Sequence, residues 1–175
     1  MKRNSLIIAV VLSLALVSGP AFATEAGTEA KLTKDQSAKI SANCSSIRQN
    51  LKNLQRSDSR ARTYFGAIYE TFSSKYLKPL NLLLVNNDIS SPDLVKLQTS
   101  FVTARSRFSE DFITYSKALE DLVATDCRLE PETFYDKLLK TREKRAIVAK
   151  DVKELNNYLV SSVKKVETLK GDLAK

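Results

Sequence analysis

The sequence predicts an all-α protein: an elongated, antiparallel three-helix bundle of the coiled-coil type with one disulfide. Through most of the chain, apolar residues recur at alternating steps of three and four, the pattern of a helix with one apolar seam. No stretch of useful length alternates apolar and polar residues, which argues against β-structure. Only two short connections separate the helical stretches, and short connections make successive helices antiparallel.

The first element, residues 1–23, has the layout of a secretory signal peptide. Lys2 and Arg3 precede a twelve-residue apolar run, and an A-x-A cleavage site ends at Ala23. Twelve apolar residues are too few for a membrane span, which needs about 20. We therefore expect cleavage before Thr24, no transmembrane span in the mature protein, and an extracytoplasmic location: secreted, periplasmic or at the cell surface.

The mature chain is expected to start with a flexible lead-in, 24–32, followed by the bundle, 33–175. Its helices are predicted at about 33–86, 92–127 and 131–170. Thr33 and Gln36 form a capping box that opens the first helix. Pro79 lies inside the pattern of that helix, so we expect a kink or an early helix end there.

The two later helices have their own start signals. Ser91 is a candidate N-cap, followed by a proline at the first helical position and by the acidic Asp93. Glu130 and Pro131 open the third helix, and Gly171 marks its end. These signals place both connections at short, polar segments.

The composition excludes several kinds of site. The chain has no His and only two Cys, so neither a tetrahedral zinc site nor a Cys–His or Ser–His catalytic pair can be built. Its four Gly residues cannot make a Gly-rich phosphate loop. We therefore predict no catalytic, metal or cofactor-binding residues and no enzymatic activity.

The two cysteines, Cys44 and Cys127, are predicted to pair. They lie near the same end of the predicted bundle, and an oxidising compartment favours a disulfide. Closing a loop of this length stabilises a fold by about 4–5 kcal/mol in the chain-entropy model. Two unpaired thiols in the core are the alternative. A redox-active pair would be close in sequence, and these are not.

Charged residues occupy seam positions of the first and third helices. Asp58 and Arg145 stand where the pattern requires apolar residues, with Arg62 and Arg142 one turn away from them. Burying one charge alone would cost several kcal/mol, so we predict a buried ion pair between Asp58 and Arg142 or Arg145, supported by Arg62. Its expected role is to fix the helix register. An active site is the less favoured alternative, because a carboxylate held by several arginines is a poor base.

The charge also differs between helices. Residues 31–86 carry ten basic and three acidic side chains, 88–130 carry five and eight, and 131–175 carry eleven and seven. An acidic middle helix between two basic ones favours antiparallel pairing and leaves the side formed by the outer two basic.

Four cations of the first helix recur at every fourth residue: Arg48, Lys52, Arg56 and Arg60. They form a ridge about 18 Å long. Because like charges at this spacing disfavour a helix slightly, the row is informative. It is either a solvated face or a surface for an anionic partner: cell-wall phosphates, lipid head groups or extracellular nucleic acid.

Two groups of apolar residues have a packing and a binding interpretation. The run 80–85 is expected to be covered by Ile89 and the end of the third helix, although it could be a partner-binding or membrane-touching tip. Tyr64, Tyr69 and Tyr76 are expected on the flank of the core with their hydroxyls in water.

Several short strings carry a resemblance to a known group of proteins. They are Cys44, Asp58 with Arg62, Tyr69-Glu70, Phe101-x3-Arg105-x2-Phe108-x2-Asp111-Phe112, Ala118-Leu119-x-Asp121-Leu122 and Asp126-Cys127. Over residues 40 to 165 the chain resembles small secreted helical proteins of candidate-phyla (Saccharibacteria-type) bacteria. The resemblance implies a secreted helical fold and supplies no activity and no site residues.

Two functions fit these observations. The first is a non-enzymatic structural or binding protein of the cell envelope, monomeric, with a basic face for an anionic cell-wall polymer or another envelope protein rather than for nucleic acid. The second is a periplasmic holdase-type chaperone. Proteins of that kind combine long helices with a β-sheet trimerisation core, and the sequence shows no strand signal.

Overall fold

The structure is a computed structural model that describes residues 32–173; the predicted signal peptide, 1–23, lies outside the described residues. The described part is helical, contains no strand and holds one disulfide, which confirms the all-α, disulfide-bonded class. Its elements are α1 (Lys34–Ala42), α2 (Cys44–Thr71), the π-helical turn η1 (Phe72–Leu77), α3 (Lys78–Asn86), α4 (Pro92–Ala124) and α5 (Pro131–Leu173).

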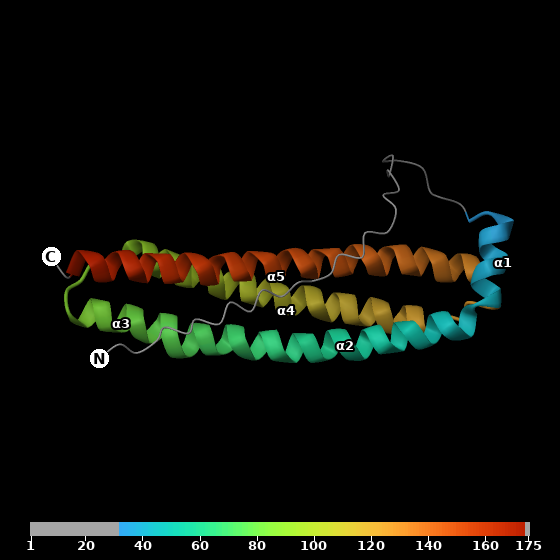
Figure 1. The fold of residues 1–175 in the computed structure, drawn as a ribbon, viewed down its shortest axis with the longest axis horizontal. Coiled ribbons are helices and arrows are strands. Elements are labelled where there is room, and N and C mark those ends of the chain that lie inside the picture. Colours follow the sequence, from blue (N-terminus) through green and yellow to red (C-terminus); the bar gives the residue numbers. More distant parts are fainter. Residues whose placement is uncertain (1–31, 174–175) are drawn as a thin grey trace, which may run out of the picture. The chain divides into compact units, whose positions relative to one another are not determined.

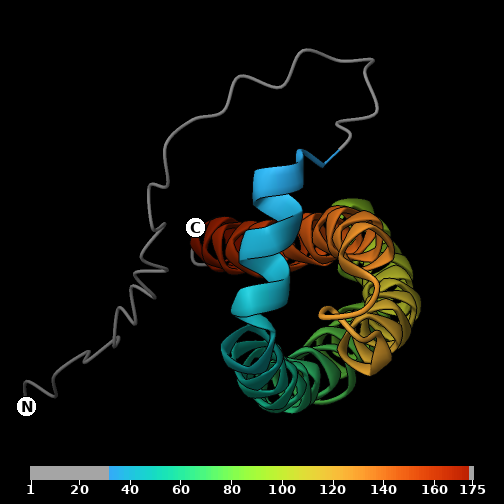
Figure 2. The ribbon, with the colours of Figure 1, turned by 90° about the vertical axis from the view of Figure 1, so that its right-hand side faces the viewer.

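Three long rods and one short helix make up this part of the chain. The α2–η1–α3 rod is continuous, α4 runs back along it, and α5 runs back along α4 (Figure 1). Viewed end-on, α4 lies between the other two rods (Figure 2). Where the sequence predicted three helices, residues 32–173 thus form four helical bodies. None of them is long and apolar enough to cross a membrane.

The additional body arises because the predicted first helix breaks at Asn43. The backbone there has φ −99° and ψ 10°, and the side-chain amide donates to the carbonyl of Lys39 at 2.8 Å. The capping box of Thr33 and Gln36 is present, as predicted. Because of the break, α1 is free to cross from the start of α2 to α5 (Figure 2), which lets Ile40 pack against the core there.

Pro79 does not end the helix. The chain passes it by widening into η1, where the N–H of Lys78 bonds the carbonyl of Ser73, five residues back. A proline has no N–H, and its ring clashes with the carbonyl four residues earlier in a regular α-helix. A wider turn directly before the proline removes that conflict, so the helix continues to Asn86.

The core has two parts along the rods. The first cluster surrounds the disulfide and contains buried residues of α2, α4 and α5: Cys44, Leu51, Tyr115, Leu119, Leu122, Cys127 and Phe134. The second lies further along: Tyr69, Leu77, Phe101, Ala104, Phe108 and Leu155. The prediction for Tyr69 was wrong, because its ring is fully buried and its hydroxyl donates to Asn156 rather than to water. Burial raises the pKa of this phenol to about 12.

The apolar run 80–85 is only partly covered, contrary to the expectation. Leu84 is buried, but Leu82, Leu83 and Val85 are 60–64% exposed. Asn81 occupies a buried position instead, and its amide donates to the carbonyl of Leu94. Because η1 rotates the helix downstream, the apolar positions of α3 no longer follow the seam of α2. Aliphatic side chains are therefore exposed at this end of the described part of the chain. It is formed by α3, residues 87–91 and the start of α4, and is called the turn end below.

Candidate functional site

The disulfide joins the first residue of α2 to the connection between α4 and α5. The Cα atoms of Cys44 and Cys127 are 5.5 Å apart and both side chains are buried. The predicted pairing is therefore confirmed. The bond holds two segments distant in sequence, the start of α2 and residues 125–130, in one place, which is called the disulfide end below.

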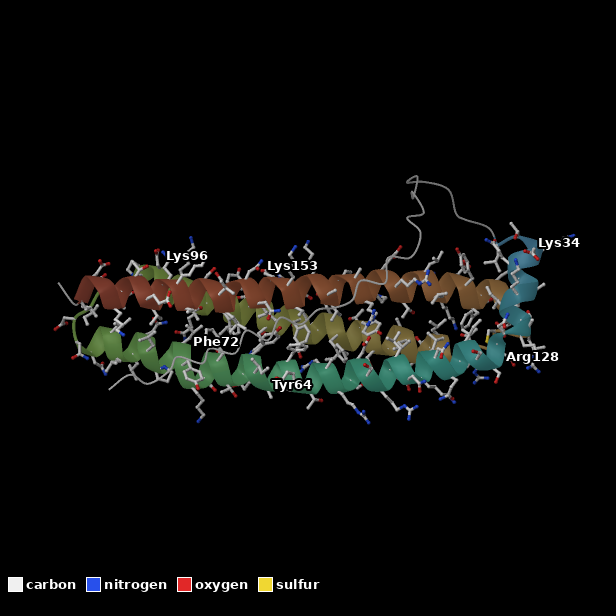
Figure 3. The ribbon with its side chains drawn as sticks, viewed as in Figure 1. Lys34, Tyr64, Phe72, Lys96, Arg128 and Lys153 are labelled. Carbon is white, nitrogen blue, oxygen red and sulfur yellow. A yellow bond between two sulfur atoms is a disulfide. The ribbon has the colours of Figure 1, made fainter. Side chains whose placement is uncertain are left out.

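A polar cavity of about 430 Å³ opens at the disulfide end. It is lined by two turns of α2 and by the α4–α5 connection: Cys44, Ser45, Arg48, Gln49, Lys52, Asp126 and Arg128. Figure 3 places Arg128 beside the junction of α1 and α2. Three of these side chains are cations and one is a carboxylate. The cavity thus gathers Arg128 with the first two members of the cationic ridge, a combination that the sequence pattern of α2 alone could not reveal.

The carboxylate of Asp126 accepts hydrogen bonds from backbone groups of the α4–α5 connection, to which it belongs. Its Oδ1 accepts the N–H of Arg128 at 2.9 Å and that of Leu129 at 3.3 Å. These two bonds hold the pKa of Asp126 below its usual value, and the charges of Arg48 and Arg128 lower the pKa further. The carboxylate therefore stabilises the backbone conformation of the α4–α5 connection. It neutralises only part of the positive charge of the cavity.

The cationic ridge carries no ion pair within residues 32–173. Arg48 is half-buried and Lys52, Arg56 and Arg60 are exposed. Arg56 donates to the amide oxygen of Asn53 at 2.6 Å, a neutral partner. By contrast, the ion pairs between the rods use cations of α4 and α5: Arg105, Arg107, Arg145 and Lys165. The free positive charge of α2 is thus available to a ligand.

The seam carboxylate of α2 meets one arginine of α5 and a tyrosine of α4. Arg145 donates from Nε to Oδ2 of Asp58 at 2.8 Å and from Nη2 to Oδ1 at 3.1 Å. Tyr115 donates its hydroxyl to the same Oδ2 at 2.6 Å. The pKa of Arg145 is raised, chiefly by its bond to Asp58, and burial raises the pKa of Tyr115 with Asp58 adding to it. Three helices are tied together at one carboxylate.

Two parts of the predicted ion-pair cluster differ in the structure. The pair lies at the edge of the core, since the side chain of Arg145 is 51% exposed and that of Asp58 is 17% exposed. Arg142 is three residues earlier on α5, a position rotated into solvent, and is not in the network. Arg62 lies toward α4, where its guanidinium donates to Ser109 and stands over aromatic rings of α4, Phe108 and Phe112.

A buried carboxylate of α5, unlike Asp58, was not predicted from the sequence. Asp151 of α5 is 3% exposed; its Oδ1 accepts from Nε of Arg107 at 3.0 Å, and its Oδ2 has no hydrogen-bond partner. Burial raises the pKa of Asp151; Arg107 opposes this and the nearby carboxylate of Asp111 adds to it. The available signal was its place one turn before the seam residue Leu155.

An apolar groove of about 370 Å³ runs along α2 and η1 beside α5. It is lined by Tyr64, Ala67, Ile68, Thr71, Phe72, Tyr76 and Leu159. Tyr64 and Tyr76 are each 63% exposed, as the sequence predicted for flanking tyrosines. Figure 3 places the labelled Tyr64 and Phe72 on the α2–η1 rod. The lining of this apolar groove offers a ligand apolar contacts and few polar groups.

No protein-family model matches the chain, and no curated protein and no solved structure is significantly similar to it. Among the described residues, no group of three or more His, Cys, Asp or Glu side chains is arranged to hold a metal ion. The site must therefore be interpreted from its own chemistry, which is positive charge held at a covalently fixed end.

Proposed function

We propose that this protein is an extracytoplasmic, non-enzymatic binding protein of the cell envelope that engages an anionic polymer through the cationic ridge of α2. The observation that carries the proposal is the row Arg48, Lys52, Arg56 and Arg60, none of which forms an ion pair with a residue of 32–173. A row of cations without ion pairs attracts anionic chains at long range, and the attraction weakens with salt.

The compartment is part of the same proposal. A buried disulfide favours an oxidising location, and the signal peptide proposed for residues 1–23 would deliver the chain there. The proposed grouping with small secreted helical proteins of candidate-phyla bacteria agrees with that location.

We further propose that the three rods act as a monomeric, elongated, antiparallel three-helix bundle, a rigid support for the ridge. Two contacts between α2 and α5 favour a fixed register. Asp58 and Arg145 are 87 residues apart in sequence, and so are Tyr69 and Asn156. Equal separations at two levels are expected of two rods that run parallel without slipping. Sedimentation velocity is expected to show an elongated monomer.

Retention on an anionic matrix tests the binding function. The wild-type protein should elute from immobilised polyphosphate or heparin at high salt, and Arg56→Glu/Arg60→Glu at much lower salt. The control, Lys96→Glu/Lys117→Glu, makes the same charge change at two exposed lysines of α4 and should elute close to the wild type. Elution of the wild type at low salt, or equal losses in the two variants, would contradict the proposal.

The apolar groove favours a second candidate, a holdase-type chaperone. The exposed aromatic rings of Tyr64 and Tyr76 could hold apolar segments of unfolded chains. A holdase should suppress aggregation of a denatured reporter protein at stoichiometric amounts, and Tyr64→Ser/Tyr76→Ser should lose that effect. An envelope-binding protein of the first kind should leave the aggregation rate unchanged.

A further inference from the structure

The cavity at the disulfide end differs from the rest of the ridge because two separate segments build it. Arg48 and Lys52 lie on successive turns of α2, whereas Arg128 comes from the α4–α5 connection. A ligand inside it would therefore meet cations from two directions. The exposed ridge residues Arg56 and Arg60 can offer charge from one helix only.

The backbone of Arg128 is fixed in three ways. The disulfide anchors the neighbouring Cys127, Asp126 accepts the N–H of Arg128 at 2.9 Å, and Ser41 of α1 donates to the carbonyl of Arg128 at 3.2 Å. The backbone that carries this cation is thus preorganised, so less backbone entropy is lost when the residue binds a ligand.

The chemistry of the lining fits a phosphate group. Two guanidinium groups and one ammonium group face a cavity whose single carboxylate, that of Asp126, already accepts two backbone N–H groups. Arginine presents parallel N–H donors that match phosphate oxygens, and lysine adds a point charge. Ser45 and Gln49 supply neutral donors. About 430 Å³ also leaves room for a small group esterified to the phosphate.

We propose that this cavity, formed by Arg48, Lys52 and Arg128, is a binding site for a phosphate group of the polymer, an inference that rests on the proposed function. Arg48 and Lys52 belong to both the cavity and the ridge, and the following cations, Arg56 and Arg60, recur at steps of about 6 Å along α2. A phosphodiester chain with one phosphate in the cavity continues over the ridge in a fixed direction. The disulfide keeps the two halves of the site together.

Titration calorimetry with inorganic phosphate tests the site directly. The wild-type protein should bind in a saturable, one-to-one manner, and Arg128→Gln should weaken binding at least about tenfold, the effect of losing a charge-assisted bond. Arg142→Gln is the matched control, because it removes the same charge from an exposed arginine outside the cavity. Its affinity should stay within about twofold of the wild type. Absence of saturable phosphate binding, or equal losses in both variants, would overturn the proposal.

Three further probes identify the source of the phosphate: glycerol 3-phosphate, poly(glycerol phosphate) and phosphatidylglycerol vesicles. The polymer should bind most tightly and depend on Arg128 as well as on Arg56 and Arg60. Binding confined to vesicles would reject the polymer as the source and assign the site to a lipid headgroup.

The phosphate site in the cavity and the proposed polymer-binding function can be contradicted separately. If Arg56→Gln/Arg60→Gln weakens polymer binding while Arg128→Gln leaves phosphate affinity unchanged, the cavity is not a phosphate site and the ridge function stands. If phosphate binds in an Arg128-dependent manner but the polymer does not bind, the polymer function is wrong and the phosphate site stands.

The contribution of the disulfide has its own variant. Cys44→Ala/Cys127→Ala, checked for retained helicity by circular dichroism, should lose phosphate affinity to a similar extent as Arg128→Gln. A helical, folded double variant with wild-type phosphate affinity would show that the bond does not hold the site together.

Discussion

The disulfide end and the turn end differ in which side chains they bury. At the disulfide end, apolar residues such as Leu119, Leu122 and Phe134 are buried around a covalent link. At the turn end, polar Asn81 takes a buried position with its Oδ1 unsatisfied, while Leu82 and Leu83 are exposed. A buried polar atom without a partner is costly, and exposed leucines contribute little to folding. We therefore expect the disulfide end, which carries the cationic cavity, to be the more stable of the two ends.

Removing the disulfide should have the largest effect on this contrast. Cys44→Ala/Cys127→Ala is expected to lower the free energy of unfolding by about 2–5 kcal/mol, because the unfolded chain regains the freedom of a long loop. Urea denaturation measures the loss. Amide exchange should accelerate mainly in residues 44–52 and 125–130. Faster exchange only at the turn end would contradict the assignment of rigidity.

Breaking the three-helix contact at Asp58 should rank second. Asp58→Ala leaves the hydroxyl of Tyr115 and the guanidinium of Arg145 without their acceptor and should cost about 1–3 kcal/mol. The control is Asp35→Ala, which removes an exposed carboxylate paired with Lys39 and should change stability by less than about 0.5 kcal/mol. Equal melting temperatures of the two variants would remove Asp58 as a structural contact.

Asp151, which lies away from the disulfide, should make the stability of the protein depend on pH. Because the pKa of Asp151 is raised in the folded protein, the folded state binds its proton more readily than the unfolded state. This residue therefore favours folding below its unfolded pKa of 3.8, and that contribution is lost as pH rises through the higher folded value. Asp151→Asn, which keeps an acceptor for Arg107, should raise stability at pH 7 by up to about 1 kcal/mol.

The advantage of Asp151→Asn should shrink as pH falls toward 4. Thermal melts of both proteins across this range, with Asp136→Asn as the exposed control on the same helix, measure it. A constant difference at all pH values would exclude titration of Asp151 as the cause.

The smallest effect is expected at the turn end itself. Asp88 has a positive φ of 56°, which costs a side-chain-bearing residue more than glycine. Asp88→Gly should therefore alter stability by only a few tenths of a kcal/mol, since relief of strain is offset by greater freedom of the unfolded chain. Asp88→Val, measured by the same denaturation assay, should be clearly destabilising. A neutral Asp88→Val would mean that the turn readjusts freely.

Periodicity and composition were sufficient for the all-α class and the disulfide. They were not sufficient for Asn43, because an apolar repeat that includes Ile40 and Cys44 continues across a break in the backbone. Nor did they reveal the environment of Asp151, since a pattern identifies the buried face of a helix but not which partner helix satisfies a polar residue on it. Arg128 was missed as a member of the cationic site because a connection acquires its position only from the fold.

The π-helical turn at 72–77 has a consequence for how this rod could change. A turn of this kind holds about one residue more than a regular turn, so everything after it faces a direction shifted by about 100°. Deleting a single residue there would re-phase α3, bringing different side chains toward α4 with little loss of length. The number of residues in η1 thus sets the direction in which the aliphatic side chains of the turn end point. It does so without affecting the cationic ridge, which lies earlier on the same rod.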